Sequence, residues 1–362
     1  HEDLPSRLVA GINLDMVGQN QELCKSTLNL DRTPDSLPSY LNDLVFRFME
    51  ESVKEFGKPS PFGFSSTFRY ATGAFSGGSD HAEFTDSTIG IPCVMLLQWP
   101  DLYYHTSMDT IDKVSEDSLK RVGWIATNAA LTLANATFET AFQLASETAS
   151  KGIIRIEEAN REAVKELFKK KQDPRLKDKP EELAEELERT SSHYKNRIEH
   201  FAWREQEAVK SVRRLGESPE LNTLLSERCR DIEGRADKAL ANLQETLSFI
   251  AKTSALTLPS QPEHAEPRKE LRVIPRRLFK GTLDSNVLKK TLSEKELEWY
   301  EEVREKDVDF DKKSAEVLNF MNGKRSVDEI VRAVSAEYSE TNPEHVLKFL
   351  QDLEKARLVN LS

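Results

Sequence analysis

Two apolar segments constrain the fold of this chain more than any other feature. The segments RLVAGINLDMVG (residues 7–18) and GIPCVMLLQW (residues 90–99) are largely apolar, and polar residues follow each of them. In a strand with one solvent-exposed face, apolar and polar residues alternate, whereas a continuously apolar strand is buried on both faces. The two segments therefore predict strands of a parallel or mixed sheet that is covered by helices on both sides.

Helical segments follow each of these strands. Residues 41–56 carry apolar side chains at helical spacing, and Gly57 ends the segment. Ser115 is a predicted N-cap, followed by the acidic first turn of a helix that runs to about residue 136. This order of elements predicts an α/β domain over residues 1–140, with a mostly parallel sheet in a three-layer αβα arrangement.

Ionisable residues lie where a sheet of this kind keeps its ligand sites. Asp15 ends the first apolar segment, His105 follows the second, and Asp80 and His81 lie in the glycine-rich loop between them. Ligands of open α/β sheets bind at the carboxyl ends of strands. Carboxylate and imidazole are ligands of catalytic zinc, and a nearby acid such as Asp109 is the expected partner that orients the imidazole. Taken singly, a turn aspartate or a lone histidine is more often structural, so the predicted zinc site depends on the combination.

The segments NLDMVG, SDHAEF, GIPCVMLLQ and YYHTSMDTIDKV occur in this order within about residues 5–140. The combination resembles the C-terminal half of the co-catalytic zinc exopeptidases of peptidase family M28, which include bacterial aminopeptidases, glutamate carboxypeptidase and glutaminyl cyclase. In that family two zinc ions are held by His, a bridging Asp, Glu, Asp and His, and a glutamate beside the ligand Glu is the general base.

The resemblance implies a role for each matching residue of this chain. Asp15 matches the fourth ligand and His105 the fifth, each on a different zinc ion. Asp80 and His81 match the loop that shapes the site, and Asp109 matches the acid that orients the last histidine. The resemblance therefore implies two zinc ions as cofactors and a peptide as the substrate.

The chain also departs from the family pattern. The first His, the bridging Asp and the pair of glutamates lie upstream of the Asp15 strand in the family, whereas only fourteen residues precede Asp15 here. The starting HED, with the neighbouring acids Glu2 and Asp3, is interpreted as a loop. Two ligands and no general base are thus expected in this chain, although catalytic zinc usually has three protein ligands. The chain is expected to be a fragment of a longer enzyme, to take its missing half from another polypeptide, or to have lost catalysis.

Residues 141–256 are rich in Glu, Lys, Arg, Ala and Leu. Residues 183–215 and 225–250 each repeat apolar side chains at alternating intervals of three and four, which is typical of coiled coils. Gly216 ends the first segment, and Pro219 lies in the first turn of the second. The pattern predicts an antiparallel helical hairpin.

Residues 257–282 are first proline-rich and then basic, and they predict a linker. Residues 283–362 are predicted to form a winged-helix-like module with a Ser326-capped helix, a proline-initiated helix and the terminal strand LVNL. The stretch NGKRSVDEI is similar to small winged-helix modules appended to peptide-modifying enzymes, which implies contact with a peptide or a protein partner. The last helix mixes acidic and basic residues, which disfavours a role in binding DNA.

The overall composition narrows the classes of partner. The net charge of −11 argues against a nucleic-acid partner, which requires a basic surface. No stretch approaches the roughly 18 apolar residues of a membrane helix. The cysteines Cys24, Cys93 and Cys229 are scattered without a CxxC pair, which disfavours a cysteine zinc site or a disulfide framework. The compartment stays open, although relatives of the resembling family are commonly exported.

The leading hypothesis is a zinc-dependent exopeptidase, specifically an aminopeptidase, whose full-length form hydrolyses peptide bonds with a water molecule activated by two metal ions. The chain alone is expected to be inactive. One alternative is a non-catalytic binding or assembly protein, in which the helical hairpin is an interaction arm on a peptidase-like half-domain. A second alternative is acyl transfer of the glutaminyl-cyclase kind, which shares the fold and much of the metal chemistry.

Overall fold

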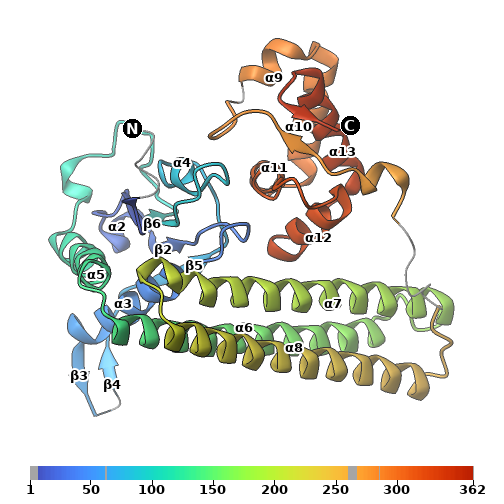
Figure 1. The fold of residues 1–362 in the computed structure, drawn as a ribbon, viewed down its shortest axis with the longest axis horizontal. Helices are drawn as coiled ribbons and strands as arrows, with labels where there is room; N and C mark the ends of the chain where they lie inside the picture. Colours follow the sequence, from blue (N-terminus) through green and yellow to red (C-terminus); the bar gives the residue numbers. More distant parts are fainter. Residues whose placement is uncertain (1–6, 62, 260–266, 285, 362) are drawn as a thin grey trace. The chain divides into compact units, whose positions relative to one another are not determined.

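The computed structural model describes residues 7–61, 63–259, 267–284 and 286–361. These residues form two compact units (Figure 1). The first comprises His1–Glu147, Lys210–Asn222 and Lys280–Thr282, and the second comprises Thr148–Val209, Thr223–Phe279 and Leu283–Ser362. The HED segment and the proline-rich centre of the predicted linker lie outside the described residues.

A four-stranded sheet organises the first unit, and its strand order is β1-β6-β2-β5. Both predicted strands are present and pair in parallel as neighbours, β1 with β6. Two further strands, β2 and β5, also pair in parallel, whereas β2 runs antiparallel to β6. The sheet is therefore mixed and mostly parallel, which is one of the two forms predicted from the sequence. The strands are β1 (Gly11–Asp15), β2 (Thr27–Asp31), β5 (Tyr70–Gly73) and β6 (Cys93–Trp99).

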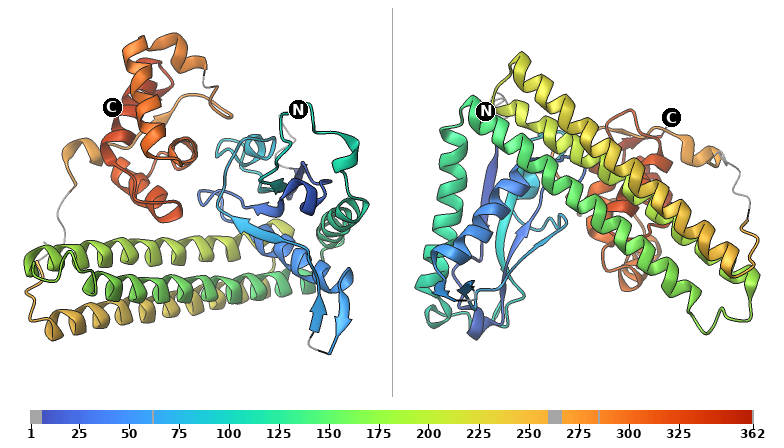
Figure 2. Two further views of the ribbon diagram at one scale, coloured as in Figure 1. Left: turned by 180° about the vertical axis from the view of Figure 1, so that it is seen from behind. Right: turned by 90° about the horizontal axis from the view of Figure 1, so that it is seen from below.

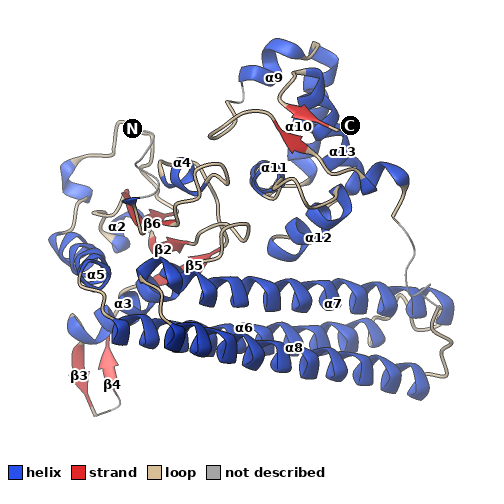
Figure 3. Cartoon of the chain, viewed as in Figure 1, coloured by secondary structure: helices blue, strands red, loops and turns tan. Residues whose placement is uncertain are grey.

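Helices bury the centre of this sheet. The helix α3 (Leu41–Glu55) packs against α5 (Glu116–Ala134) and also contacts β2 and β6. The short helix α4 (His81–Thr85) contacts β1 and β6. The side chains of β6 from Cys93 to Leu96 are all buried, as expected for a continuously apolar strand. The smaller elements of this unit are α2 (Gln21–Cys24), η1 (Ile111–Lys113) and the hairpin of β3 (Lys58–Ser60) and β4 (Gly63–Ser65) (Figure 3).

The strand β1 lies at one end of the strand order. Its inner edge pairs with β6, and within the described part of the chain no other strand pairs with its outer edge. The side chain of Leu14 on this strand is 46% exposed. An unpaired strand edge with an exposed apolar side chain is a surface that can accept another strand.

Three long helices dominate the second unit and lie side by side in both views of Figure 2. Polar contacts give their directions: Glu157 and Asn160 of the first helix contact Arg235 and Asn242 of the third, so these two run parallel. The middle helix runs antiparallel to the third, as predicted for the hairpin, and ends in η2 (Ser211–Leu215). The first helix was not part of the predicted hairpin. The three helices are α6 (Phe138–Lys171), α7 (Pro180–Lys210) and α8 (Pro219–Thr253).

A buried ion network joins two of these helices. The carboxylate of Glu205 on α7, 1% exposed, accepts hydrogen bonds from Nε of Arg155 on α6 and Nε of Arg204, both at 2.9 Å. Gly152 lies opposite Glu205, because a Cβ atom built at this glycine would come within 2.9 Å of the Glu205 Cβ. The glycine thus makes room for the carboxylate between the helices.

The remaining part of the second unit is a small module with a core of its own. Buried residues of this core include Val327, Ile330, Leu350 and Leu353, together with Leu271 from the predicted linker. A short antiparallel pair of strands closes the module, and its first strand also comes from the predicted linker. Residues 269–277 of the predicted linker thus contribute to the core and to the strand pair of this module. Its elements are η3 (Lys269–Arg272), β7 (Arg276–Arg277), α9 (Asn286–Thr291), α10 (Glu294–Lys306), α11 (Phe310–Asn319), α12 (Val327–Glu337), α13 (Pro343–Lys355) and β8 (Val359–Asn360).

None of the described helices is long and apolar enough to cross a membrane.

Candidate functional site

The candidate site begins at one edge of the four-stranded sheet. Asp15 is the last residue of β1 and is aligned with Leu97 of the parallel strand β6. His105 follows the carboxyl end of β6 by six residues, counted from Trp99. Because the carboxyl ends of parallel neighbours meet at the same edge, both residues lie at the edge where α/β sheets bind ligands.

Two left-handed backbone positions occur at these residues. Met16, directly after Asp15, has φ 54°, and His105 itself has φ 55°. Such conformations cost non-glycine residues on the order of 1–3 kcal/mol and cluster at functional sites. The turn after Asp15 is held by β6, because the backbone N–H of Gln98 donates to the carbonyl of Met16 at 3.0 Å.

The loop that carries His105 is organised by aromatic contacts. The imidazole of His105 is exposed and stacks on the ring of Tyr104, with 3.7 Å between centroids and 22° between planes. Tyr104 in turn meets the ring of Trp99 edge to face at 5.2 Å. The predicted partner Asp109 is exposed, and the structure shows no hydrogen bond between it and His105 within the described chain. The role of Asp109 in orienting His105 stays a prediction.

The glycine-rich loop is anchored to two strands. On one side, the side-chain amide of Asn13 on β1 donates to the Ser79 hydroxyl at 2.8 Å. On the other side, Asp31 at the end of β2 accepts from the backbone N–H of Ser76 at 2.9 Å and also from the Ser76 hydroxyl. Left-handed φ values of 67° at Gly77 and 80° at Gly78 let the chain turn between these anchors.

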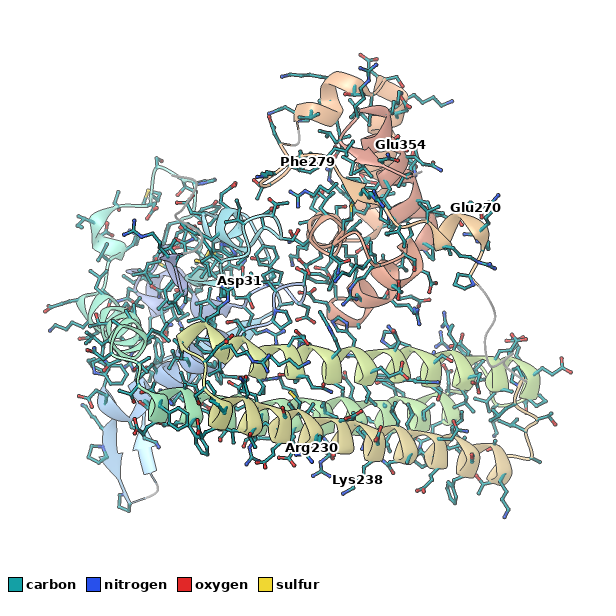
Figure 4. The ribbon with its side chains drawn as sticks, in the orientation of Figure 1. Asp31, Arg230, Lys238, Glu270, Phe279 and Glu354 are labelled. Carbon is teal, nitrogen blue, oxygen red and sulfur yellow. The ribbon has the colours of Figure 1, made fainter. Side chains whose placement is uncertain are left out.

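Asp80 and His81, adjacent in sequence, lie in opposite environments. His81 is fully buried, and its Nε2 lies 3.2 Å from Oδ2 of Asp31 (labelled in Figure 4), without the alignment of a hydrogen bond. The ring of Phe75 meets the imidazole edge to face at 5.3 Å. Asp80 is exposed and precedes α4 without a side-chain capping bond. The structure thus places Asp80 at the surface and His81 in the interior, beside Asp31 and Phe75.

Two thiols of this unit are poor candidates for a ligand role. Burial raises the pKa of Cys24, and the carboxylate of Asp101 raises it further. Burial also raises the pKa of Cys93 to about 11. Because the thiolate is the form that binds metal, both cysteines favour the neutral, non-coordinating state near pH 7.

Asp15 and His105 are chemically suitable ligands for zinc, but two ligands are fewer than a catalytic zinc site usually has. Asp15 supplies a carboxylate and His105 an imidazole, which are the oxygen and nitrogen donors of catalytic zinc. Among the described residues no three His, Cys, Asp or Glu side chains form a group that could hold a metal ion. A complete site therefore requires at least one further donor in addition to these two.

The residues that anchor the loop, namely Asn13, Asp31 and Ser76, were not among the predicted site residues. One signal was present in the sequence, because Asp31 ends the segment TLNLD, in which leucines alternate with polar residues as in a strand, just as Asp15 ends its strand. The partners of Asp31 lie 45 and 50 residues further along the chain, so their pairing appears only in the folded structure.

Comparison with known families gives two matches. Residues 2–130 match the family model described as peptidase family M28, and residues 305–359 match the one described as coenzyme PQQ synthesis protein D (PqqD). The first match spans Asp15 and His105, and it supports, in general terms, a zinc-dependent metallopeptidase. No curated protein and no solved structure matches the chain.

Proposed function

We propose that this protein is a zinc-dependent exopeptidase, specifically an aminopeptidase, and that Asp15 and His105 each bind one of two zinc ions. The observation that supports the proposal is the position of these residues at the carboxyl ends of adjacent parallel strands, within the segment that matches peptidase family M28. Zinc, when bound, polarises the peptide carbonyl and lowers the pKa of a water molecule.

The residues of this chain hold and orient the donors of the proposed site. Stacking on Tyr104 restricts rotation of the His105 ring, so that its direction is set before a ligand binds. The contacts of Asn13 with Ser79 and of Asp31 with Ser76 fix the loop just before Asp80, whose carboxylate is open to solvent. An exposed carboxylate at this place is suited to the charged amino end of a peptide.

We propose that the other zinc ligands and the general base come from residues that are not among the 362 of this sequence, or from a second polypeptide. Several apolar side chains of the loop after β6 are exposed, with Leu102 at 63%, Met108 at 58% and Ile111 at 86%. Together with the unpaired edge of β1, they form a surface that a further segment can cover.

Zinc binding tests the metal assignment directly. The purified chain is equilibrated with zinc, and the bound metal is compared among wild type, Asp15→Asn, His105→Ala and the matched control His345→Ala in the second unit. We expect weak uptake by wild type and the control and lower uptake by both site variants. Equal uptake by all four proteins would remove Asp15 and His105 from the site.

Activity tests the reaction. We expect no hydrolysis of aminoacyl amides by the chain alone, and zinc-dependent hydrolysis by the protein purified from its native source that disappears with His105→Ala. Robust turnover by the 362-residue chain would show that the general base lies within it. Cyclisation of an N-terminal glutaminyl peptide, with release of ammonia in place of a free amino acid, would instead assign acyl transfer.

A second candidate function is non-catalytic binding. It is favoured by the finding that the described residues contain no group of three metal-binding side chains. A native protein that binds no zinc and hydrolyses no amide would support this candidate over the peptidase.

A further inference from the structure

The loop that carries His105 contains a buried lysine. Residues 101–114 join β6 to α5, and the structure describes all of them. Lys113 alone among them is buried, with 7% of the residue exposed, whereas Asp109, Ile111 and Asp112 are exposed. Lysine is almost never fully buried unless its charge is paired, so the burial of this side chain in an exposed loop requires a reason.

An ion pair does not by itself account for this burial. The ammonium group of Lys113 donates to the carboxylate of Asp112, and this hydrogen bond raises the pKa of Lys113, which is therefore charged at neutral pH. The Asp112 side chain is 66% exposed, so the same pair could form at the surface of the loop. The amine also lies against the ring of Tyr103, with 4.7 Å between Nζ and the ring centroid, which is a cation–π contact.

This contact joins the two limbs of the loop. Tyr103 lies on the limb that leaves β6, and Lys113 lies on the limb that leads into α5. Both limbs are hydrogen-bonded to the segment that follows β1. The backbone N–H of Leu102 donates to the carbonyl of Cys24 at 3.2 Å, and the N–H of Asn20 donates to the carbonyl of Lys113 at 2.7 Å. Lys113 therefore lies where the loop closes, and its side chain holds the ring of Tyr103 at this place.

Tyr103 in turn anchors the turn that presents His105. The carbonyl of Tyr103 accepts from the backbone N–H of Thr106 at 3.0 Å and from the Thr106 hydroxyl at 2.7 Å. His105 lies inside this turn with a left-handed φ of 55°. Its exposed imidazole stacks on the neighbouring Tyr104, so the direction of the imidazole follows the backbone of the turn. A displacement of Tyr103 would therefore move the imidazole.

We propose that Lys113 is a positioning residue for His105, because its cation–π contact with Tyr103 fixes the turn that carries the imidazole. The importance of this role for catalysis rests on the proposed function, in which His105 binds zinc. The role itself belongs to the chain without metal, so it can be tested without zinc.

Proton NMR of the full chain tests the proposal. The ring of Tyr104, stacked 3.7 Å from the imidazole, should shift the Cε1 proton of His105 upfield of a histidine in an unfolded chain. The signal is identified by its loss in His105→Ala, and all spectra are recorded at one pH above the ordinary pKa of histidine. Lys113→Met keeps an unbranched side chain without the charge, and we expect it to return the signal most of the way to the unfolded position.

Four further variants isolate the cation–π contact. Tyr103→Leu removes the ring and should displace the His105 signal as Lys113→Met does, whereas Tyr103→Phe keeps the ring and should leave the signal in place. Lys113→Arg keeps a cation over the ring and should preserve the wild-type signal. Lys120→Met is the matched control, since Lys120 is an exposed lysine on α5 that pairs with Glu116 at 2.7 Å, and it should not move the signal.

The signal of His81 in the same spectra reports whether the first unit is folded. His81 is buried beside Phe75, and its signal should keep the wild-type position in every variant. A wild-type His105 signal in both Lys113→Met and Tyr103→Leu would overturn the proposal. A joint displacement of the His81 and His105 signals would also overturn it, because Lys113 would then stabilise the unit as a whole.

Zinc binding separates this inference from the proposed function. If His105 binds zinc, Lys113→Met should weaken zinc binding by roughly tenfold, as expected for the loss of a group that orients a metal ligand, and Lys113→Arg should restore it. A displaced His105 signal with unchanged zinc binding would support the role of Lys113 and contradict the zinc role of His105.

Discussion

Asp80 and His81 show how strongly the environment of a single residue decides its role. The carboxylate of Asp80 is exposed, whereas the neighbouring imidazole of His81 is 0% exposed beside Asp31. Sequence patterns predicted Asp15 and His105 at strand ends because each follows a continuously apolar segment. The same patterns could not separate Asp80 from His81, because burial here depends on β2 and on the ring of Phe75.

Substitution of Asp31 is expected to destabilise the first unit strongly. Asp31→Ala removes the acceptor for Ser76 and leaves His81 buried without its carboxylate, which should cost about 2–4 kcal/mol of unfolding free energy. Asp80→Ala is the matched control and should change stability by less than about 0.5 kcal/mol. Urea denaturation of both variants measures the difference, and an equal effect would contradict the buried network.

Among the elements, the three-helix bundle depends on an ion network that its apolar repeat does not reveal. The seven-residue pattern predicted α7 and α8 because apolar spacing is visible in sequence. It could not predict that Glu205 of α7 is buried between Arg155 and Arg204, since a charged residue is ordinarily assigned to the surface. The helix α6, which was not part of the predicted hairpin, supplies both Arg155 and the space at Gly152.

Two glycine substitutions on long helices should have opposite effects. Gly152→Ala places a methyl group 2.9 Å from the Glu205 side chain and should destabilise the bundle by about 1–3 kcal/mol. Gly234→Ala on α8 meets no atom within 4 Å and should stabilise the helix by about 0.5–1 kcal/mol. Thermal unfolding followed by circular dichroism compares the two. A stabilising effect of Gly152→Ala would show that the helices do not approach closely there.

Acid should weaken the same network. Burial raises the pKa of Glu205, but Arg155 and Arg204 outweigh burial and lower the pKa to about 2 from the ordinary 4.5. Because the folded-state pKa lies below that of the unfolded chain, the stabilisation is complete above pH 4.5 and is lost as the pH falls towards 2. The stability difference between wild type and Glu205→Gln should therefore shrink over this interval. Urea titrations at several pH values measure it, and a constant difference would contradict the assignment.

At the scale of the whole molecule, each of the two compact units is assembled from segments that are far apart in the sequence. The turn between α7 and α8 belongs to the first unit: the Ser211 hydroxyl accepts from the backbone N–H of Tyr40 at 3.1 Å, and Arg214 donates to the carbonyl of Gly90 at 2.7 Å. Sequence composition separates an α/β part from a helical part, but it carries no signal for such contacts between distant segments. The boundaries of a unit depend on tertiary contacts more than on local pattern.

Two units with separate cores should unfold in two steps. We expect calorimetry to resolve two transitions, with Asp31→Ala lowering the temperature of one and Gly152→Ala lowering that of the other. A single transition that both variants shift equally would mean that the chain unfolds as one cooperative body.

The chain as a whole is expected not to bind DNA. Its net charge is −11, and two basic residues of the predicted linker have partners in the module: Arg268 pairs with Glu344, and Arg277 lies over the Phe279 ring at 4.2 Å. Titration with duplex DNA at low salt should show no binding that weakens as salt is added. A clear salt-dependent affinity would contradict this expectation.

The unpaired edge of β1 also governs how the protein behaves in concentrated solution. The strand GINLD carries neither proline nor lysine, the residues that commonly prevent a sheet from growing by addition of strands from other molecules. Mutual repulsion between molecules of charge −11 opposes such growth, and dissolved ions screen that repulsion over roughly 8–10 Å at physiological ionic strength. Solubility of the isolated chain should therefore fall as ionic strength rises, and dilute buffers of low salt are the conditions that keep it dispersed.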